Sequence, residues 1–586
     1  MLKITVYKIN NLKTAFRLAS ACLIAILLVA CAAQNTNLQR PAASPSPTLP
    51  LPIVTSAIPP PTTDTLSDPT NKTNSSALPE QGASPSVCLD YSEDLPRNLK
   101  TQIQALNQKT CQSGSQRLQV HLGQSTGMPL GSWVYALVAP FPTVTDGLTA
   151  ESLRNYWQKG RSAEFSVLGM TRETAQSLAA LWGDPIGKVE ILTSEALTDW
   201  TWQTKSAWAI VPFEDLTPRL KVISLDGISP IQKTYVPQVY ALTVPISLEV
   251  QDGENQNLLL SYFQDELPLT NCDPKKLASV ILTGVTALVR ATAWGMENEG
   301  LDKPAEIIGH TLREADITHV SNEASFALDC PDPQNEHLSL LLCSKPSYLE
   351  TLKAIGTDVV ELTGDHLNDW GNQALLDTLA LYRQTGIQTF GGGENSTAAS
   401  EPALFEVNGN KIAFVGCNSK HVGYPVATAT APGALDCDID DMVRQVKYLA
   451  QHGYLTIVGI QHTELSSWYP SERMQREFAE LAQAGAVIVS GSEAHRPQTF
   501  TFGGVDGNSF LHYGLGNLFF DQDTMGGDYD KAFIDRHVFY DGRYISTEIL
   551  TVQFPNSLTP VWADTPTRSE LLNMFFWTSG LIPSPW

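Results

Sequence analysis

Apolar runs alternate with amphipathic segments along the second half of the chain. Five runs rich in Val, Ile and Leu have the length of buried strands, and each ends in polar residues. The segments between them have helical spacing, and several end in Gly, which commonly closes a helix. The five runs are DVVELTGDH (358–366), KIAFVGCNSKH (411–421), LTIVGIQHTE (455–464), AVIVSGSEAH (486–495) and FLHYGLGN (510–517). This order predicts an α/β domain over residues 275–555, with helices covering a sheet.

A second α/β pattern fills residues 87–270 and predicts a smaller domain of its own. Strand-like runs cover 131–142, 206–216 and 219–227, and helix-like segments opened by Thr cover 149–160 and 171–183. The stretches VAPFPTVTDGLTAESLRNYWQKG and WAIVPFEDL resemble, weakly, solute-binding domains of the phosphate-binding kind. That resemblance implies ligand capture. Because this segment carries no chemical constellation, a structural or docking domain remains the alternative.

The first residues of the chain follow the order of a secretory signal. Four basic residues within the first 17 positions precede the apolar run LASACLIAILLVAC, which ends at Cys31. The closing LVAC resembles the lipobox of bacterial lipoproteins, which implies removal of residues 1–30 and a diacylglycerol on the sulfur of Cys31. A plain signal peptide is the alternative. We therefore expect an exported protein, held by lipid at the outer face of the bacterial cell membrane or envelope.

Composition narrows the classes of partner. Residues 31–86 are dominated by Pro, Ser, Thr, Asn and Ala, which predicts an extended, disordered tether between the lipidated Cys31 and the folded part. The formal net charge of −23 argues against nucleic acid as a partner, because binding phosphate backbones requires clustered Lys and Arg. No stretch after residue 30 is long and apolar enough to span a bilayer.

The cysteines fit an oxidising compartment, where disulfides are permitted. Of the nine cysteines, one lies in the signal, one is the Cys31 expected to carry the lipid, and seven follow. Proximity in sequence suggests three pairs and leaves Cys272 over, although spacing alone does not settle connectivity. The suggested pairs are Cys88–Cys111, Cys330–Cys343 and Cys417–Cys437.

Carboxylates and imidazoles recur where the predicted strands end. The carboxyl ends of parallel strands meet at one edge of a sheet, so these side chains are expected to lie close together. Both groups bind divalent metals such as zinc, manganese and iron. Three successive strand exits carry them, which is a stronger signal than any single residue. The residues are Asp365, His366, His462, Glu464, Glu493 and His495.

In sequence order, several blocks resemble the bacterial CapA family, which is named for poly-γ-glutamate capsule biosynthesis and is related to calcineurin-like metallophosphoesterases. The blocks are LREADITHVSNEAS (312–325), ELTGDHLNDWG (361–371), GIQHTE (459–464), LAQAGAVIVSGSEAHRPQ (481–498) and HYGLGNLFFDQ (512–522). The resemblance implies a metallophosphoesterase-like α/β sandwich. Residues 556–586 are then expected to form a C-terminal tail that packs on this domain.

The resemblance also implies a site and roles within it. His366 would be the proton donor, and Asp365 would be both a catalytic residue and a metal ligand. The remaining implied ligands are Glu323, His462, Glu464, Glu493 and His495. Hydrolysis would use a hydroxide bound to manganese, iron or zinc.

One departure from the family's pattern affects the metal. In the run SVILTGVTALVRAT (279–292), Val285 stands where the family has a ligating aspartate. Since valine cannot bind a cation, the site is expected to hold one divalent ion or none.

Two functions follow from the same residues. The first is a metal-dependent hydrolase or transferase that takes part in the biosynthesis or processing of a capsule polymer of the poly-γ-glutamate type. The alternative is a non-catalytic envelope protein that binds an extracellular polymer, or an anionic oligomer of it, or helps its export.

Overall fold

The computed structural model describes residues 87–584, apart from residues 114, 124–126, 250–262, 264–266 and 338. The predicted signal peptide, the lipidated Cys31 and the tether up to residue 86 lie outside these residues. Within the described part of the chain, no helix combines the length and apolarity that a bilayer crossing requires.

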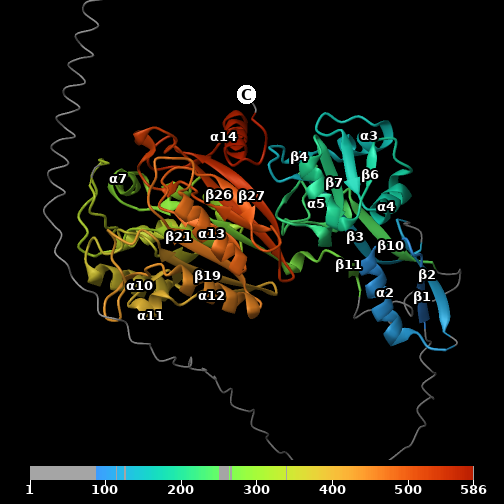
Figure 1. Cartoon of the computed structure of the whole chain (residues 1–586), viewed down its shortest axis with the longest axis horizontal. Helices are drawn as coiled ribbons and strands as arrows, with labels where there is room; N and C mark the ends of the chain where they lie inside the picture. Colours follow the sequence, from blue (N-terminus) through green and yellow to red (C-terminus); the bar gives the residue numbers. More distant parts are fainter. Residues whose placement is uncertain are drawn as a thin grey trace, which may run out of the picture. The chain divides into compact units, whose positions relative to one another are not determined.

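The first part of the described chain folds around one mixed sheet, whose strands β1, β2, β3, β6, β7, β10 and β11 are labelled in Figure 1. Its strands follow the order β1-β2-β10-β3-β7-β5-β6, and β8 and β11 pair with β3. The central strand β3 buries Trp133 and Tyr135 completely. The strands are β1 (Val87–Tyr91), β2 (Gln116–Leu122), β3 (Met128–Pro140), β5 (Val167–Met170), β6 (Val189–Ile191), β7 (Ala207–Pro212), β8 (Leu220–Val222), β10 (Thr243–Leu248) and β11 (Leu269–Thr270).

Helices pack beside this sheet, and a small parallel pair of strands lies apart from it. The two Thr-capped helices expected from the sequence are confirmed: Thr149 accepts from the Ser152 amide, and Thr171 accepts from the Thr174 amide. The helices are α2 (Arg97–Thr110), α3 (Ala150–Lys159), α4 (Arg172–Trp182) and α5 (Ser194–Gln203), and the small pair is β4 (Gly147–Leu148) with β9 (Ser224–Leu225).

The second part of the described chain contains two sheets that face each other. The larger has the order β16-β15-β14-β12-β26-β27-β28, with β13 paired to β14 and β25. The smaller has the order β18-β19-β21-β22-β24-β23. A shared apolar layer joins them, in which Val280 and Val359 of the larger sheet pack with Phe414 and Ile457 of the smaller. This confirms an α/β sandwich.

The strands of the larger sheet are β12 (Leu277–Leu282), β13 (Val285–Thr286), β14 (Ile317–Asn322), β15 (Thr357–Glu361), β16 (Gln388–Phe390), β25 (Asn517–Phe519), β26 (Lys531–Tyr540), β27 (Arg543–Gln553) and β28 (Val561–Trp562). Those of the smaller are β18 (Ala403–Val407), β19 (Asn410–Asn418), β21 (Leu455–Gln461), β22 (Ala486–Ser492), β23 (Phe500–Gly503) and β24 (Ser509–His512). A separate antiparallel pair joins β17 (Gly392–Gly393) to β20 (Gly433–Ala434).

Helices cover the outer faces of the sandwich. One apolar cluster joins the larger sheet to α7, α8, α9 and α10, and another joins the smaller sheet to α12 and α13. The C-terminal helix α14 buries Leu572 and Phe575 in a further cluster with Phe533 of β26. The helices are α7 (Arg290–Glu299), α8 (Gly309–Arg313), α9 (Leu349–Ala354), α10 (Asn372–Thr385), α11 (Ser396–Ala399), α12 (Ile439–Gln451), α13 (Glu472–Ala484) and α14 (Thr565–Thr578).

One predicted strand divides between the two sheets. The run 510–517 forms the end of β24, which pairs with β22, and the start of β25, which pairs with β13 of the other sheet. The break falls at residues 513–516, where Gly516 has a φ of 86°, a left-handed conformation that glycine adopts readily. The glycine therefore lets the chain cross from one sheet to the other.

Three disulfides are formed within the described residues. They join Cys88 to Cys111, Cys330 to Cys343 and Cys417 to Cys437, the pairs that proximity in sequence suggests. Cys272 is free and buried. The second disulfide closes the loop after β14, and the third ties the end of β19 to the segment before α12.

Candidate functional site

Polar side chains from both sheets meet at the carboxyl ends of their parallel strands. Glu323 follows β14 and Asp365 lies four residues beyond β15, both in the larger sheet. Lys420 lies two residues beyond β19, Gln461 ends β21 and Glu493 follows β22, all in the smaller sheet. Strands β14 and β15 run parallel, as do β19, β21 and β22. This edge of the sandwich is the place where α/β folds gather functional groups.

Three carboxylates form the centre of the site, and we call Glu323, Asp365 and Glu493 the carboxylate cluster. One oxygen from each lies within 4.8 Å of the others. Glu323 and Glu493 are buried, and the Asp365 side chain is 15% exposed. Glu493 has a φ of 78°, a left-handed conformation that is strained for a residue with a side chain.

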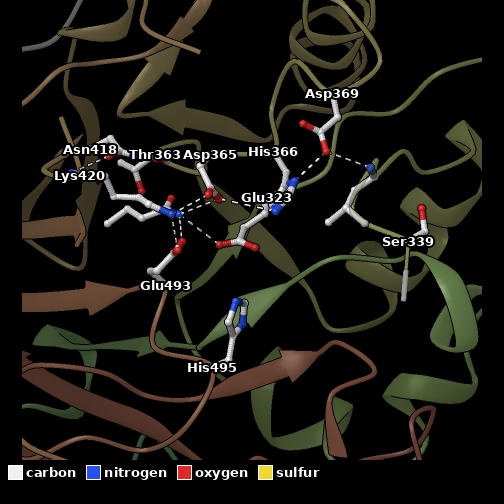
Figure 2. A network of polar contacts seen from close by, with 12 residues as sticks. Glu323, Ser339, Thr363, Asp365, His366, Asp369, Asn418, Lys420, Glu493 and His495 are labelled. Carbon is white, nitrogen blue, oxygen red and sulfur yellow. Dashed lines mark hydrogen bonds and ion pairs between the residues drawn. The ribbon is translucent and has the colours of Figure 1, made fainter. Parts of the chain in front are cut away.

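A lysine ammonium lies among these carboxylates (Figure 2). Lys420 Nζ is 2.6 Å from Asp365 Oδ2 and 2.5 Å from Glu493 Oε1. The amide of Gln461 also faces the cluster: its Nε2 donates to Asp365 Oδ1 at 3.2 Å, and it contacts Glu323 and Glu493 as well. The cluster therefore has a positive charge and a neutral donor within hydrogen-bond distance.

The protonation of the cluster follows from burial and mutual repulsion. Burial, with added repulsion from Glu493 and Asp365, raises the pKa of Glu323 well above its usual range. Burial and then Asp365 raise the pKa of Glu493 to about 7. Burial alone would raise the pKa of Asp365, but His366 and Lys420 hold it below its usual value. Burial would lower the pKa of Lys420, but Glu493 and Asp365 outweigh it, so that the ammonium stays charged.

A histidine held by an aspartate lies beside the cluster (Figure 2). His366 Nδ1 is 2.6 Å from Asp369 Oδ2, and Nε2 is 3.9 Å from Asp365 Oδ1. Asp369 also accepts from the Leu342 amide at 2.9 Å, in the loop closed by the second disulfide. Burial would lower the pKa of His366, but Asp369 and Asp365 raise it above its usual value. Since its side chain is 27% exposed, His366 can exchange a proton with a bound molecule.

The structure brings together some of the residues expected at the site and separates others. Glu323, Asp365 and Glu493 form the cluster, with His366 next to it. His495 points toward the cluster in Figure 2, but its Nδ1 is 2.9 Å from Asn517 Oδ1 and the ring belongs to no ligand group among the described residues. Glu464, expected as a ligand, is exposed and accepts a hydrogen bond from Tyr529.

His462 lies on the other face of its strand. Its Nε2 is 3.5 Å from Glu477 Oε2 on α13, and its Nδ1 accepts from the Thr463 amide. Successive side chains of a strand point to opposite faces, so the neighbouring Gln461 faces the cluster instead. The expected ligand His462 is thus replaced at the cluster by an amide.

The residues present do not fit a two-metal hydrolytic centre. Val285 is 1% exposed in an apolar cluster with Ala287, Val289 and Phe520, so it leaves no ligand on that side. Gln461 directs its Nε2, a hydrogen-bond donor, at the carboxylates, and would have to turn its amide over to offer Oε1 to a metal. Lys420 holds the oxygens of Asp365 and Glu493 that a cation would need. The three carboxylates could accept a single divalent ion only with the ammonium displaced.

Lys420, Gln461 and Asp369 also belong to the site, although they are not among the residues expected from the sequence. The alternation of side chains along LTIVGIQ was a usable signal, because it places Gln461 and not His462 on the same face as Gly459. That face looks toward the opposite sheet, since a Cβ at Gly459 would collide with the carboxylate of Glu361. The direction of Lys420 had no sequence signal, because it lies in a loop.

Part of the chain is similar to known proteins. Residues 279–522 match the family model of the bacterial capsule synthesis protein PGA_cap. The capsule biosynthesis protein CapA of Bacillus anthracis is 27% identical over 216 residues, which is 36% of this chain and 51% of that protein. The PGA biosynthesis protein CapA of Bacillus subtilis strain 168 is 24% identical over 249 residues, 42% of this chain and 64% of that protein. The matches thus span about half to two thirds of the length of these relatives.

A solved structure also matches part of the chain. The 5'-nucleotidase precursor from Thermus thermophilus is 11% identical over 52% of this chain and 59% of that chain, with a TM-score of 0.29.

Proposed function

We propose that this chain is an envelope protein that holds a capsule polymer of the poly-γ-glutamate type during its synthesis or export. The basis is that residues 279–522 match the bacterial capsule synthesis family. The names of two relatives support this class of process: a capsule biosynthesis protein and a PGA biosynthesis protein. The proposal concerns binding and does not include metal-dependent cleavage of the polymer.

The position of the Lys420 ammonium is the observation that favours binding over metal-dependent hydrolysis. It lies 2.6 Å from Asp365 and 2.5 Å from Glu493, the carboxylates on which a hydrolytic cation would depend. Val285 at the same edge supplies no ligand, and Gln461 directs its Nε2 donor at the carboxylates. What remains is a partly open polar surface of donors and acceptors.

This surface suits a chain of amides that bear carboxylates. The 27% exposed side chain of His366 and the 18% exposed side chain of Lys420 offer N–H donors to a polymer carboxylate. The exposed part of Asp365 can accept from a polymer amide. Polymer carboxylates that do not reach His366 or Lys420 would be repelled by the protein, because its net charge is −23.

The compartment is part of the proposal. Three disulfides within the described residues support an exported protein, because such bonds persist in oxidising compartments. We place the folded part outside the cell membrane, attached through a lipid on Cys31 and the tether of residues 31–86. Absence of radiolabelled palmitate from the protein in growing cells, with Cys31→Ala as the control, would contradict the lipid anchor.

Polymer binding can be measured by the fluorescence anisotropy of a labelled γ-linked glutamate oligomer titrated with the full chain. We expect saturable binding that tightens as NaCl rises from about 20 to 200 mM, because screening weakens the repulsion between two polyanions. His366→Gln should weaken binding about tenfold, the loss of one charge-assisted hydrogen bond. His310→Gln, a histidine with a 78% exposed side chain, is the matched control.

Two outcomes would contradict the proposal. No saturable binding at any salt concentration would remove the polymer as a partner. Equal affinity for an α-linked glutamate oligomer of the same length would show that only charge is recognised.

A second candidate, a hydrolase of the same polymer, is favoured by the His366–Asp369 pair. Asp369 fixes Nδ1 of the ring, so Nε2 is the atom that would give a proton to a leaving group. Shortening of an unlabelled polymer on a gel, abolished by His366→Gln, would select this function over binding alone.

A further inference from the structure

The backbone of Lys420 is held by a hydrogen bond to a buried asparagine. Asn418, at the end of β19, is fully buried. Its Nδ2 donates to the Thr363 carbonyl at 2.7 Å, and its Oδ1 accepts from the Lys420 amide at 2.8 Å. One side chain therefore joins the loop that carries Asp365 to the loop that carries Lys420.

The segment between Asn418 and Lys420 is also tied to the helix behind it. The Ser419 amide donates to the Gln461 carbonyl at 2.7 Å, and its hydroxyl donates to Glu477 of α13 at 2.7 Å. Arg473 donates to the Ser419 carbonyl at 2.6 Å. These hydrogen bonds constrain the backbone of the loop that carries Lys420, so that its side chain is directed at the carboxylate cluster.

The ammonium supplies a charge that the cluster needs. Three carboxyl groups within 4.8 Å of one another, two of them buried, cannot all be ionised without a nearby cation, because their charges would repel each other strongly. Lys420 Nζ contacts two of the three, and the donor Gln461 Nε2 contacts all three. A second positive ion at the same oxygens would have to displace the ammonium or share its ligands.

We propose that Lys420 is the built-in cation of this site, so that the native chain takes up no divalent ion at the carboxylate cluster, and that removing the ammonium turns the cluster into a divalent-cation site. The proposal does not depend on the polymer: it holds whether this edge of the sandwich binds the polymer, cleaves it or does neither.

The test is a calorimetric titration of the full chain with MnCl₂, after dialysis against a chelator. The native chain should show no saturable uptake at the cluster. Lys420→Ala should bind one equivalent, at least about 100-fold more tightly than the native chain, because no ammonium competes for the oxygens. In the same variant, Mn²⁺ should raise the melting temperature, since an ion that binds only the folded state stabilises it.

Three further variants separate charge from side-chain loss. Lys420→Arg keeps a cation and should stay unresponsive to Mn²⁺. Lys420→Ala combined with Glu493→Gln removes one ligand and should lose the uptake gained by the single variant. Lys411 lies near the start of β19, and its ammonium sits over the ring of Tyr454. The variant Lys411→Ala should therefore behave like the native chain.

The outcomes decide the proposal in either direction. Uptake of one equivalent of Mn²⁺ by the native chain, lost in Glu493→Gln alone, would overturn it, whether or not Lys420→Ala folds. A folded Lys420→Ala that takes up no ion would overturn the second half, because the carboxylates would then not form a latent cation site. Polymer binding is measured separately, so its failure leaves this result intact.

Discussion

Two histidine–aspartate pairs in the sandwich have the same geometry and different surroundings. His366 and Asp369 at the strand edge, and His512 and Asp535 between the sheets, each place Nδ1 2.6 Å from a carboxylate oxygen. The His366 side chain is 27% exposed and lies beside a charged cluster, whereas both side chains of the second pair are fully buried. The geometry of such a pair therefore does not mark a functional site; access and neighbouring charge do.

The buried pair joins the two sheets. His512 belongs to β24 of the smaller sheet and Asp535 to β26 of the larger, and the His512 ring lies against Phe500 and Phe533. No polymer could reach these groups. Their contribution is to the stability of the sandwich, whereas His366 and Asp369 are partly exposed at the edge to which we assign the proposed polymer binding.

Asp535→Ala should have the largest effect on stability. It leaves the fully buried His512 without its partner, and breaking a buried pair from one side costs about 3–5 kcal/mol. Urea denaturation followed by tryptophan fluorescence measures the loss. A loss of less than about 1 kcal/mol, as found for exposed pairs, would mean that water reaches this layer and would remove the contrast with the strand edge.

The same buried region should make the protein sensitive to acid. Burial lowers the pKa of His537 on β26 to about 4, against about 6.5 in the unfolded chain. Between these values the unfolded state binds more protons, so stability falls as pH decreases from 6.5 toward 4, by up to roughly 3 kcal/mol. Urea denaturation of the native chain at several pH values in this window measures the slope.

The variant His537→Gln identifies the source of that slope. It should lose less stability between pH 6.5 and 4.5 than the native chain does. His310→Gln, whose side chain is 78% exposed, should retain the native slope. An unchanged slope in His537→Gln would assign the acid sensitivity to other groups.

Removing the buried Asn418, which holds the Lys420 loop, should cause an intermediate loss of stability. Asn418→Ala removes two hydrogen bonds of a fully buried side chain, to Thr363 and to Lys420, and should cost about 2 kcal/mol. Asn395→Ala is a matched control, because this asparagine caps the short helix α11 away from the cluster and should cost about 1 kcal/mol. Equal losses would mean that the Lys420 loop is held by other contacts, such as those of Ser419.

Sequence patterns predicted the fold well where strands and helices have a clear period. The apolar runs became β15, β19, β21 and β22, and the Thr-capped segments became α3 and α4. Period and capping could not reveal that the run 510–517 serves both sheets. That division depends on a glycine turn and on pairing between distant strands, which local patterns do not encode.

The position of the candidate site was predictable from the sequence, but the identity of some of its side chains was not. The carboxyl ends of the parallel strands indicated the edge at which Asp365 and Glu493 meet, and the family resemblance added Glu323, which lies beside them. The choice of His462 over Gln461 followed residue chemistry where strand alternation should have decided. Lys420 lies in the loop after β19, so only the tertiary structure shows that its ammonium reaches the carboxylates.

Asp369→Ala should have the smallest effect on stability and so completes the contrast with Asp535→Ala. The Asp369 side chain is 17% exposed, so water can replace it beside His366 and the Leu342 amide, and the loss should be about 1 kcal/mol. The proposed polymer binding should nevertheless weaken about fivefold, because the His366 ring loses the contact that orients Nε2. Denaturation and anisotropy on the same preparation measure both effects. A stability loss as large as that of Asp535→Ala, with unchanged binding, would make Asp369 part of the scaffold and leave His366 without a positioning residue.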